Sequence, residues 1–219
     1  MDYLTDFDRL ARRRKYARRR RLLVLGIVLL VLAVTLVLLW QTLSRPSLAK
    51  KLESVTVPDW IEQDIIRMGG PSRRGFALAE LNDIVVHYVG NPGTTAKQNR
   101  NYFDNPNSAV SSHFVIGLDG EIVQCLPLYE ISAASNHRNR DTISIEVCHP
   151  DESGKFTEAT YQSLLRLTVW LLDVANLPDN RVIRHYDVTG KECPRYFVRH
   201  PESWETFLAD VSAYRKQKN

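Results

Sequence analysis

The sequence predicts an α/β fold in which helices flank a mixed central β-sheet, preceded by one N-terminal transmembrane helix. Short β-rich runs alternate with longer amphipathic stretches along most of the chain, and one Asp-Gly hairpin signal interrupts the alternation. Such a pattern is typical of a sheet covered by helices and disfavours all-α and all-β folds. A third observation, an uncharged apolar stretch near the N-terminus, predicts the transmembrane helix.

Positive charge is concentrated in the N-terminal tail. The formal net charge is +4, and residues 1–21 contain nine of the 29 Lys and Arg residues but only three of the 25 Asp and Glu residues. From residue 22 onward, 20 basic residues stand against 22 acidic ones. The remainder therefore lacks the excess positive charge of a nucleic-acid-binding domain. The tail alone could bind nucleic acid or organise cytoplasmic partners, but its position beside an apolar segment favours a role in membrane topology and contact with anionic lipids.

Residues 22–40 form the apolar segment, which carries no charge. About 20 apolar residues are needed for a helix to cross the hydrocarbon core. The arginine-rich flank favours a cytoplasmic N-terminus, and Trp40 suits the opposite interface. A cleaved signal peptide is the alternative, although its apolar region is usually about 7–15 residues and ends at a small-x-small site. We expect a stalk over residues 41–57 and an extracytoplasmic domain over residues 58–219, in a single-pass membrane protein.

The first part of the domain contains two predicted helices and a strand. Residues 58–68 place apolar side chains at helical spacing behind Pro58, which suits a first helical turn. Residues 84–89 are a compact β-rich run, typical of a buried strand, and the Asn-Pro-Gly sequence at 91–93 ends it. Residues 96–103 are expected to be helical.

The hairpin signal divides residues 113–125 at Asp119-Gly120, which predicts two short antiparallel strands. Residues 142–148 indicate another central strand. Residues 157–175 are a clear amphipathic helix with Thr157 as its cap.

The end of the chain supplies one more strand and a closing helix. Residues 181–184 predict a short strand, and residues 201–214 predict the helix. Three cysteines, Cys125, Cys148 and Cys193, are too few for a disulfide framework. A bridge between Cys125 and Cys148 is one possibility outside the cell, and the sequence leaves it open.

The segment RHYDVTGKECPR contains two candidate metal ligands, His185 and Cys193, eight residues apart. Imidazole and thiolate both bind zinc well, and a loop of this length can fold back to present both. His87, in the predicted strand 84–89, is the best-placed third ligand. Three protein ligands with a fourth position open to water define a catalytic zinc site. From spacing alone, Cys193 could equally be a buried thiol and His185 could bond a backbone carbonyl.

Four motifs together carry a family resemblance: IVVHYVGNPGTTAKQN, SSHFVIGLDGEIVQ, DTISIEVCHPDESGKF and VIRHYDVTGKECP. In this order, the chain from about residue 58 to 211 resembles the zinc-dependent N-acetylmuramoyl-L-alanine amidases, which are related to phage T7-type lysozyme and the peptidoglycan recognition proteins. The resemblance implies the fold of that family and Zn²⁺ bound by His87, His185 and Cys193. It also implies a peptidoglycan or muropeptide substrate, cut between N-acetylmuramic acid and L-alanine.

The resemblance also implies two catalytic residues, Glu146 and Lys191. Some family members have an acid–base tyrosine before the histidine of the hairpin motif, but this chain has Ser112 there. Others use a glutamate at the position of Glu146. That carboxylate would accept a proton from a water whose pKa zinc lowers toward ~7, and Lys191 would stabilise the oxyanion. Without the motif, Glu146 would be read as part of a structural ion pair and Lys191 as an exposed loop lysine.

The other polar residues receive weaker assignments. The polar loop ASNHRNRD could line a substrate groove through Asn136, His137 and Arg138, or it could simply be solvated. A Ser112–His113 nucleophile lacks the G-x-S-x-G turn and a third partner. We expect His113 to pack or hydrogen-bond near the hairpin. The remaining histidines, His149 and His200, are expected at the surface.

These expectations describe a membrane-tethered zinc amidase of the bacterial cell wall. The alternative is a non-catalytic, membrane-anchored peptidoglycan-binding protein. Relatives that only recognise peptidoglycan typically lack the zinc-binding cysteine, so the presence of Cys193 favours the enzyme.

Overall fold

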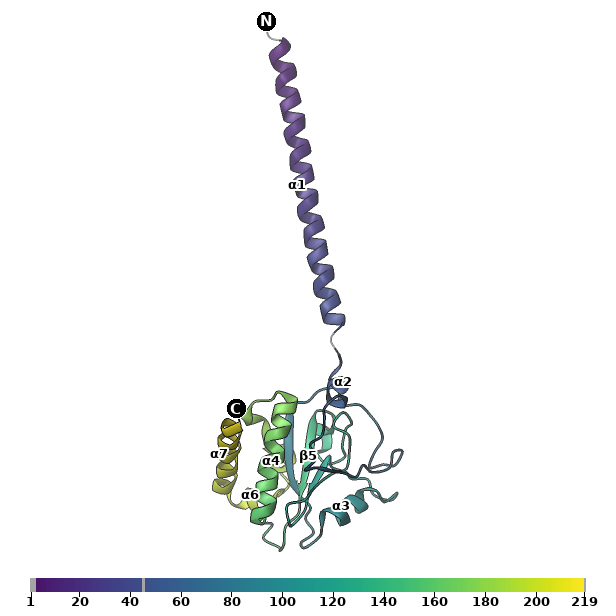
Figure 1. The fold of residues 1–219 in the computed structure, drawn as a ribbon, viewed down its shortest axis with the longest axis vertical. Coiled ribbons are helices and arrows are strands. Elements are labelled where there is room, and N and C mark those ends of the chain that lie inside the picture. The colour runs from purple at the N-terminus through teal and green to yellow at the C-terminus, as the bar shows by residue number, and fades with distance from the viewer. Residues whose placement is uncertain (1–2, 45, 219) are drawn as a thin grey trace. The chain divides into compact units, whose positions relative to one another are not determined.

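The computed structural model describes residues 3–44 and 46–218, which belong to two compact units, 1–46 and 47–219. Helix α1 (Tyr3–Leu43) accounts for most of the first unit (Figure 1). Its stretch Arg9–Gln41 is long and apolar enough to cross a membrane, with a mean hydropathy of 3.4 in its most apolar window. The predicted N-terminal apolar helix is therefore present, and it extends without a break into the basic tail.

The second unit is built on a six-stranded sheet in the order β1-β4-β3-β5-β2-β6. Neighbouring strands are parallel except β3 and β4, so the sheet is mixed, as predicted. The hairpin forms where the Asp-Gly pair indicated it, with Gly120 at φ 85°, in the left-handed region that favours glycine. The strands are β1 (Glu62–Gln63), β2 (Asp83–Tyr88), β3 (Phe114–Ile116), β4 (Ile122–Gln124), β5 (Thr142–Val147) and β6 (Val182–Arg184).

Helices cover both faces of this sheet. Figure 1 shows α4 and α7 on one face and α3 on the other, in agreement with the contacts between these elements. The helices of the unit are α2 (Leu48–Glu53), α3 (Ala96–Phe103), α4 (Glu158–Ala175), α5 (His185–Thr189), α6 (Arg195–Arg199) and α7 (Pro201–Lys218), with 3₁₀ helices η1 (Asn136–Arg140) and η2 (Asp179–Arg181).

Local sequence signals account for the two predicted helices α3 and α4. Thr95 and Gln98 form a capping box at the start of α3. The Oγ1 of Thr157 accepts a hydrogen bond from Thr160 N at 3.1 Å at the start of α4. Asn176, at φ 52°, ends α4 in the left-handed conformation common at helix C-termini.

Strand alternation places the polar residues of interest on one face of the sheet. The buried apolar side chains form two clusters, and the larger one includes Leu164 and Leu167 of α4 and Phe207 of α7. Val86 and Ile145 belong to this larger cluster. Because successive side chains point to opposite faces, His87 and Glu146 lie on the face that does not pack against α4. The parallel register of β2 and β5 pairs His87 with Glu146. The sheet therefore brings these two side chains together at the carboxyl ends of adjacent central strands.

The prediction of a helix over residues 58–68 is wrong. Within this segment, Glu62–Gln63 form the edge strand β1, and Ile66 N donates to Cys125 O at 3.0 Å beyond it. Ile61 is buried in the larger apolar cluster, whereas Ile66 is buried in the smaller one that includes α3 residues. A helix lying on one face of the sheet could not reach both clusters. An edge segment can, and its backbone pairs with β4 instead.

Three other segments refine the sequence expectations. Residues 48–53, expected in the stalk, form α2, and Leu52 is buried in the larger apolar cluster. His149 is fully buried, not at the surface, and its ring centroid lies 5.0 Å from that of Tyr88. Cys125 and Cys148 are free thiols.

Candidate metal centre and catalytic cleft

His87 is fixed near the end of β2. Only 1% of its surface is exposed, and the strand that carries it is paired on both sides, with β5 and β6. Its Nε2 lies 3.1 Å from Ser135 Oγ, in the segment just before η1. The position of the imidazole is thus determined by the sheet and by one hydrogen bond from outside it.

His185 reaches the same place from the neighbouring strand. Val86 of β2 is in register with Arg184, the last residue of β6, so His185 follows beside His87. The two rings have their centroids 4.5 Å apart. His185 is 6% exposed, and its Nε2 lies 3.0 Å from Asn136 Oδ1.

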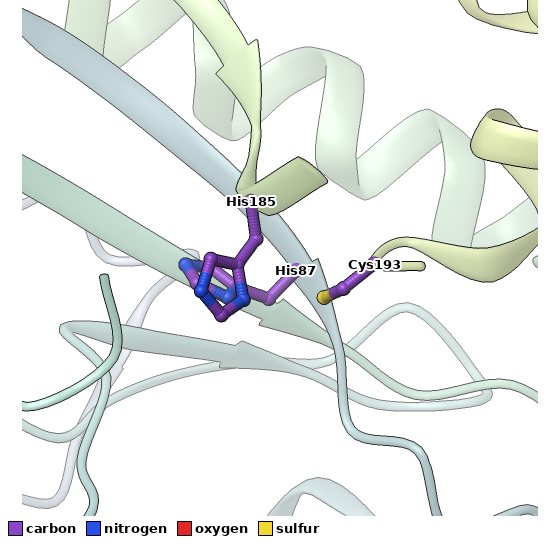
Figure 2. Close-up of side chains that lie close together, drawn as sticks. All are labelled: His87, His185 and Cys193. Atoms are coloured by element: carbon purple, nitrogen blue, oxygen red, sulfur yellow. The ribbon is translucent and has the colours of Figure 1, made fainter. Parts of the chain in front are cut away.

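Cys193 returns to the histidines through a tight loop. Gly190, at φ 75°, ends α5 in the left-handed region. The chain then turns back, and Tyr186 N donates to Cys193 O at 2.8 Å. Figure 2 shows the two imidazole rings and the sulfur of Cys193 converging from three separate segments. The nearest ligand atoms of the three residues all lie within 4.8 Å of one another.

The hydrogen bonds around the histidines leave one nitrogen of each free for a metal. The amide oxygen of Asn136 can only accept, so His185 donates through Nε2 and keeps the lone pair on Nδ1. The hydroxyl of Ser135 occupies Nε2 of His87 and can accept a hydrogen bond from it, which would leave Nδ1 for a metal. A partner on the second ring nitrogen is the usual arrangement around metal-binding histidines, because it fixes tautomer and orientation.

The protonation states also suit a cation. Burial, with the charges of His185 and Lys191 adding to it, holds the pKa of His87 well below its usual value, so this imidazole is neutral and able to coordinate. Burial raises the pKa of the Cys193 thiol to about 12, and the nearby Glu146 adds to the rise. A thiolate in such surroundings requires a cation beside it. Burial and the charge of Lys191 also lower the pKa of His185. Two imidazoles that stay neutral and one buried thiol therefore fit zinc by donor chemistry and spacing.

Glu146 lies next to the three donors. Its Oε1 is 3.9 Å from His87 Nδ1, and its Oε2 is buried without a hydrogen-bond partner in the described part of the chain. Burial raises the pKa of Glu146 to about 8, although the charge of Lys191 opposes the rise. A buried carboxylate with a free oxygen is unusual in a structural ion pair and is typical of a group that exchanges protons.

The donors open onto a cleft with two connected parts. An inner cavity of about 450 Å³ is lined by His87, Glu146 and Cys193, among others. An outer cavity of about 860 Å³ extends from it over the loops around residues 71–74, 109–110 and 131–139. Lys191 is exposed and lines both cavities, as does His185. A substrate in the cleft would therefore pass Lys191 as it approaches the donors.

Comparison with known proteins assigns the family. The family model described as N-acetylmuramoyl-L-alanine amidase matches residues 78–196, more than half of the chain. This chain belongs to the N-acetylmuramoyl-L-alanine amidase family. The matched segment contains all three candidate metal ligands together with Glu146 and Lys191, and the resemblance inferred from the four motifs is confirmed.

Individual members of the amidase family support the assignment. The chain is 35% identical to the N-acetylmuramoyl-L-alanine amidase CwlH of Bacillus subtilis (strain 168) over 162 residues, which cover 70% of this chain and 61% of CwlH. It is 27% identical to CwlL of Bacillus licheniformis, covering 70% of this chain and 47% of that protein. The solved catalytic domain of XlyA is 30% identical, with a TM-score of 0.61 over 69% of this chain and 98% of that domain. The chain thus spans roughly half to three fifths of these curated relatives and nearly the whole of the XlyA domain.

Three residues expected to bind substrate occupy different environments in this amidase-family domain. Asn136 contacts His185 and lines the outer cavity. Arg138 forms ion pairs with Asp83 and Asp141, so its guanidinium anchors η1. His137 is exposed and is not among the residues that line the two cavities.

The hairpin histidine is structural, as expected. His113 is fully buried, accepts at Nδ1 from Ser144 N at 3.1 Å and donates from Nε2 to Glu130 O at 2.8 Å. Ser112 is also fully buried and donates to Ser144 O at 2.8 Å, which removes it from the cleft and from any role as a nucleophile.

Ser135 is the site residue that sequence reasoning missed. A serine in a polar loop carries no signal for contact with a histidine 48 residues earlier. Only the approach of this loop to the ends of β2 and β6 makes it a partner of the metal-ligand cluster.

Proposed function

We propose that this chain is a zinc-dependent N-acetylmuramoyl-L-alanine amidase that hydrolyses the amide between N-acetylmuramic acid and L-alanine in peptidoglycan. The observation that carries the proposal is the convergence of His87, His185 and Cys193 beside a buried, unpartnered carboxylate oxygen of Glu146. Membership of the amidase family supports the bond type and the substrate class.

The three donors would hold the zinc ion. Bound there, zinc would supply the Lewis-acid chemistry that makes water nucleophilic near neutral pH and polarises a carbonyl. Ser135 and Asn136 would hold the two imidazoles in the tautomer that coordinates through Nδ1.

Glu146 is proposed as the general base and then the general acid. Its carboxylate takes a proton from the attacking water and delivers that proton to the nitrogen of the departing L-alanine. In the metal-free site, burial raises the pKa of Glu146 to about 8, which favours the protonated form needed to deliver the proton. The positive charge of bound zinc would favour the ionised form needed to accept it.

Lys191 is proposed to stabilise the developing oxyanion. Lys191 lines both cavities, and the scissile carbonyl would lie where they meet. A positive charge aimed at an oxygen that becomes negative in the transition state lowers the barrier more than it strengthens substrate binding.

The proposal is tested by incubating purified peptidoglycan with the full-length chain in detergent and measuring newly exposed N-terminal L-alanine. The parent should release it, and Glu146→Gln should lower the rate while retaining zinc. Release of reducing sugar ends or of other amino termini by the parent would assign the activity to another bond.

We further propose that α1 anchors the protein with its basic end in the cytoplasm and the amidase domain outside. The arginine-rich tail over residues 9–21 next to the apolar stretch supports this orientation. The proposed parts are a cytoplasmic tail (1–21), a transmembrane helix (22–40), a stalk (41–57) and the catalytic domain (58–219). Protease added to intact protoplasts should remove the domain and spare the tail; protection of the domain would reverse the orientation.

A further inference from the structure

Two adjacent arginines in the loop over residues 69–76 have opposite environments. Arg73 makes a bidentate ion pair with Glu130, at 2.8 and 2.7 Å, and its side chain is 12% exposed. Arg74 is exposed and makes no hydrogen bond or ion pair within the described part of the chain, yet it lines the outer cavity. Arg73 therefore has a structural role, whereas the guanidinium of Arg74 is available to a ligand.

The loop that carries Arg74 is held firmly on both sides. Ser72 Oγ donates to Ser108 O at 2.7 Å, and Ser111 Oγ donates to Ser72 O at 2.6 Å. After Arg74, Phe76 O accepts from Ile131 N at 2.9 Å. The backbone of Arg74 is thus fixed at the rim of the outer cavity, which limits the conformational entropy lost when its side chain binds a ligand.

The charge lining the outer cavity is of one sign. Arg74 and Lys191 line it, and no aspartate or glutamate is among the described residues that do. The inner cavity differs, because it contains Glu146. An outer cavity with unpaired cations and no carboxylate favours an anionic ligand.

Within the proposed reaction, the two halves of the substrate differ in charge. The glycan is uncharged once the lactyl carboxyl group is held in the amide, whereas the stem peptide carries free carboxylates. We propose that the outer cavity binds the stem peptide and that Arg74 binds one of its free carboxylates. This inference rests on the proposed amidase function.

Arg74 and Lys191 would then have separate tasks. Lys191 lines both cavities and is proposed to act on the scissile carbonyl, whereas Arg74 lines the outer cavity and not the inner one. In the proposed arrangement, Arg74 would contact a carboxylate of the peptide, and Lys191 would act at the amide that is cut. The planar guanidinium matches a carboxylate through two parallel hydrogen bonds, which a lysine cannot reproduce.

The test compares Arg74→Gln and Arg74→Lys with the parent full-length chain in detergent. Lys216→Gln, on the exposed surface of α7, removes the same charge away from the cleft. The substrates are synthetic muramoyl peptides with every stem carboxylate free, or with each one amidated in turn. Loss of one charge-assisted carboxylate pair should raise the KM of Arg74→Gln about tenfold on the free substrate and leave kcat unchanged.

Amidation of the recognised carboxylate should raise the KM of the parent by a similar factor and leave Arg74→Gln unaffected. On the free substrate, the KM of Arg74→Lys should lie between those of the parent and Arg74→Gln, and the KM of Lys216→Gln should match that of the parent. The assignment would be overturned if Arg74→Gln raised KM above that of the parent equally on the free and amidated substrates, or did not raise it at all.

Calorimetric binding of the free stem peptide separates this inference from the proposed activity. Peptide binding that depends on both Arg74 and a free carboxylate, in a protein that cuts no muramoyl amide, would support the subsite and refute the amidase function. Cleavage of the amide, together with peptide binding that is the same in the parent and in Arg74→Gln, would support the amidase function and refute the subsite. A parent that neither cuts the amide nor binds the peptide would refute both.

Discussion

Asn136 accepts a hydrogen bond from Nε2 of His185 at 3.0 Å, from a backbone position at φ 56°. The left-handed conformation is uncommon for a residue other than glycine, and such strain often occurs where a side chain must be aimed at a functional group. Ser135, the preceding residue, places its hydroxyl oxygen 3.1 Å from Nε2 of His87. One short segment therefore orients both candidate imidazole ligands.

Replacing Asn136 by glycine should weaken zinc binding. Glycine adopts the left-handed backbone without strain, so the change removes the amide while preserving the loop. Loss of a hydrogen-bond partner of a metal-ligating histidine typically costs about 10–100-fold in metal affinity. Competition with a chromophoric chelator measures the affinity, and a variant that held zinc as tightly as the parent would refute the orienting role.

Replacing Cys193 by serine should abolish zinc retention and turnover with little change in fold. Serine is close to cysteine in size, but its hydroxyl is a far weaker zinc ligand than a thiolate. Cys148→Ser is the matched control, because Cys148 is also buried but lies outside the donor set. Atomic emission after dialysis should find zinc in the parent and the control only, and zinc in Cys193→Ser at the parent level would contradict the ligand assignment.

Replacing Lys191 by glutamine should lower kcat by about 10²–10³ with zinc content unchanged, as expected when one oxyanion donor is lost. Lys155→Gln removes an exposed lysine that is not among the cleft-lining residues and serves as the control. Steady-state kinetics on a muramoyl peptide checks this. A change confined to KM would show instead that Lys191 contributes only to substrate binding.

Stability should fall as the pH drops below 6.5, and His113 should contribute to the fall. Burial lowers the pKa of His113 to about 4, against about 6.5 in the unfolded chain. The unfolded state therefore binds the proton first, so this stabilisation is complete above pH 6.5 and is lost as the pH falls toward 4. The shift in the pKa of His113 corresponds to roughly 3 kcal/mol in the free energy of unfolding.

His113→Gln, which does not titrate, should reduce the loss of stability as the pH falls. Urea unfolding of the metal-free protein between pH 7.5 and 4.5 measures it for parent and variant. Glutamine can donate to Glu130 O and accept from Ser144 N as the neutral imidazole does, so the variant isolates the proton. Parallel pH curves for the two proteins would contradict a neutral, buried His113.

Sequence reasoning succeeded where the signal was local. The Asp119-Gly120 turn and the Thr157 cap depend on backbone preferences of a few residues, and the structure confirms both elements. It failed for residues 58–68, where helical spacing of apolar side chains was outweighed by pairing with β4 and by burial on both faces of the sheet. Tertiary context overrides local periodicity in such short segments.

The candidate site shows the same division. The ligand set was inferred from motifs, and the sheet register explains why residues so distant in sequence meet. Ser135 could not be predicted as a partner of His87, because their contact depends on how a polar loop approaches the sheet. Arg73 and Arg74 are alike in sequence, and only the position of Glu130 shows that one is paired.

Mass spectrometry of purified muropeptides can identify both the bond that is cut and the metal that is needed. The full-length protein in detergent is incubated with them alone, with a zinc chelator, and with the chelator followed by excess zinc. We expect free peptides that begin with L-alanine and glycans with an intact lactyl group, absent with the chelator and restored by zinc. Products cut at another bond, or the same products at an undiminished rate in the chelator, would contradict it.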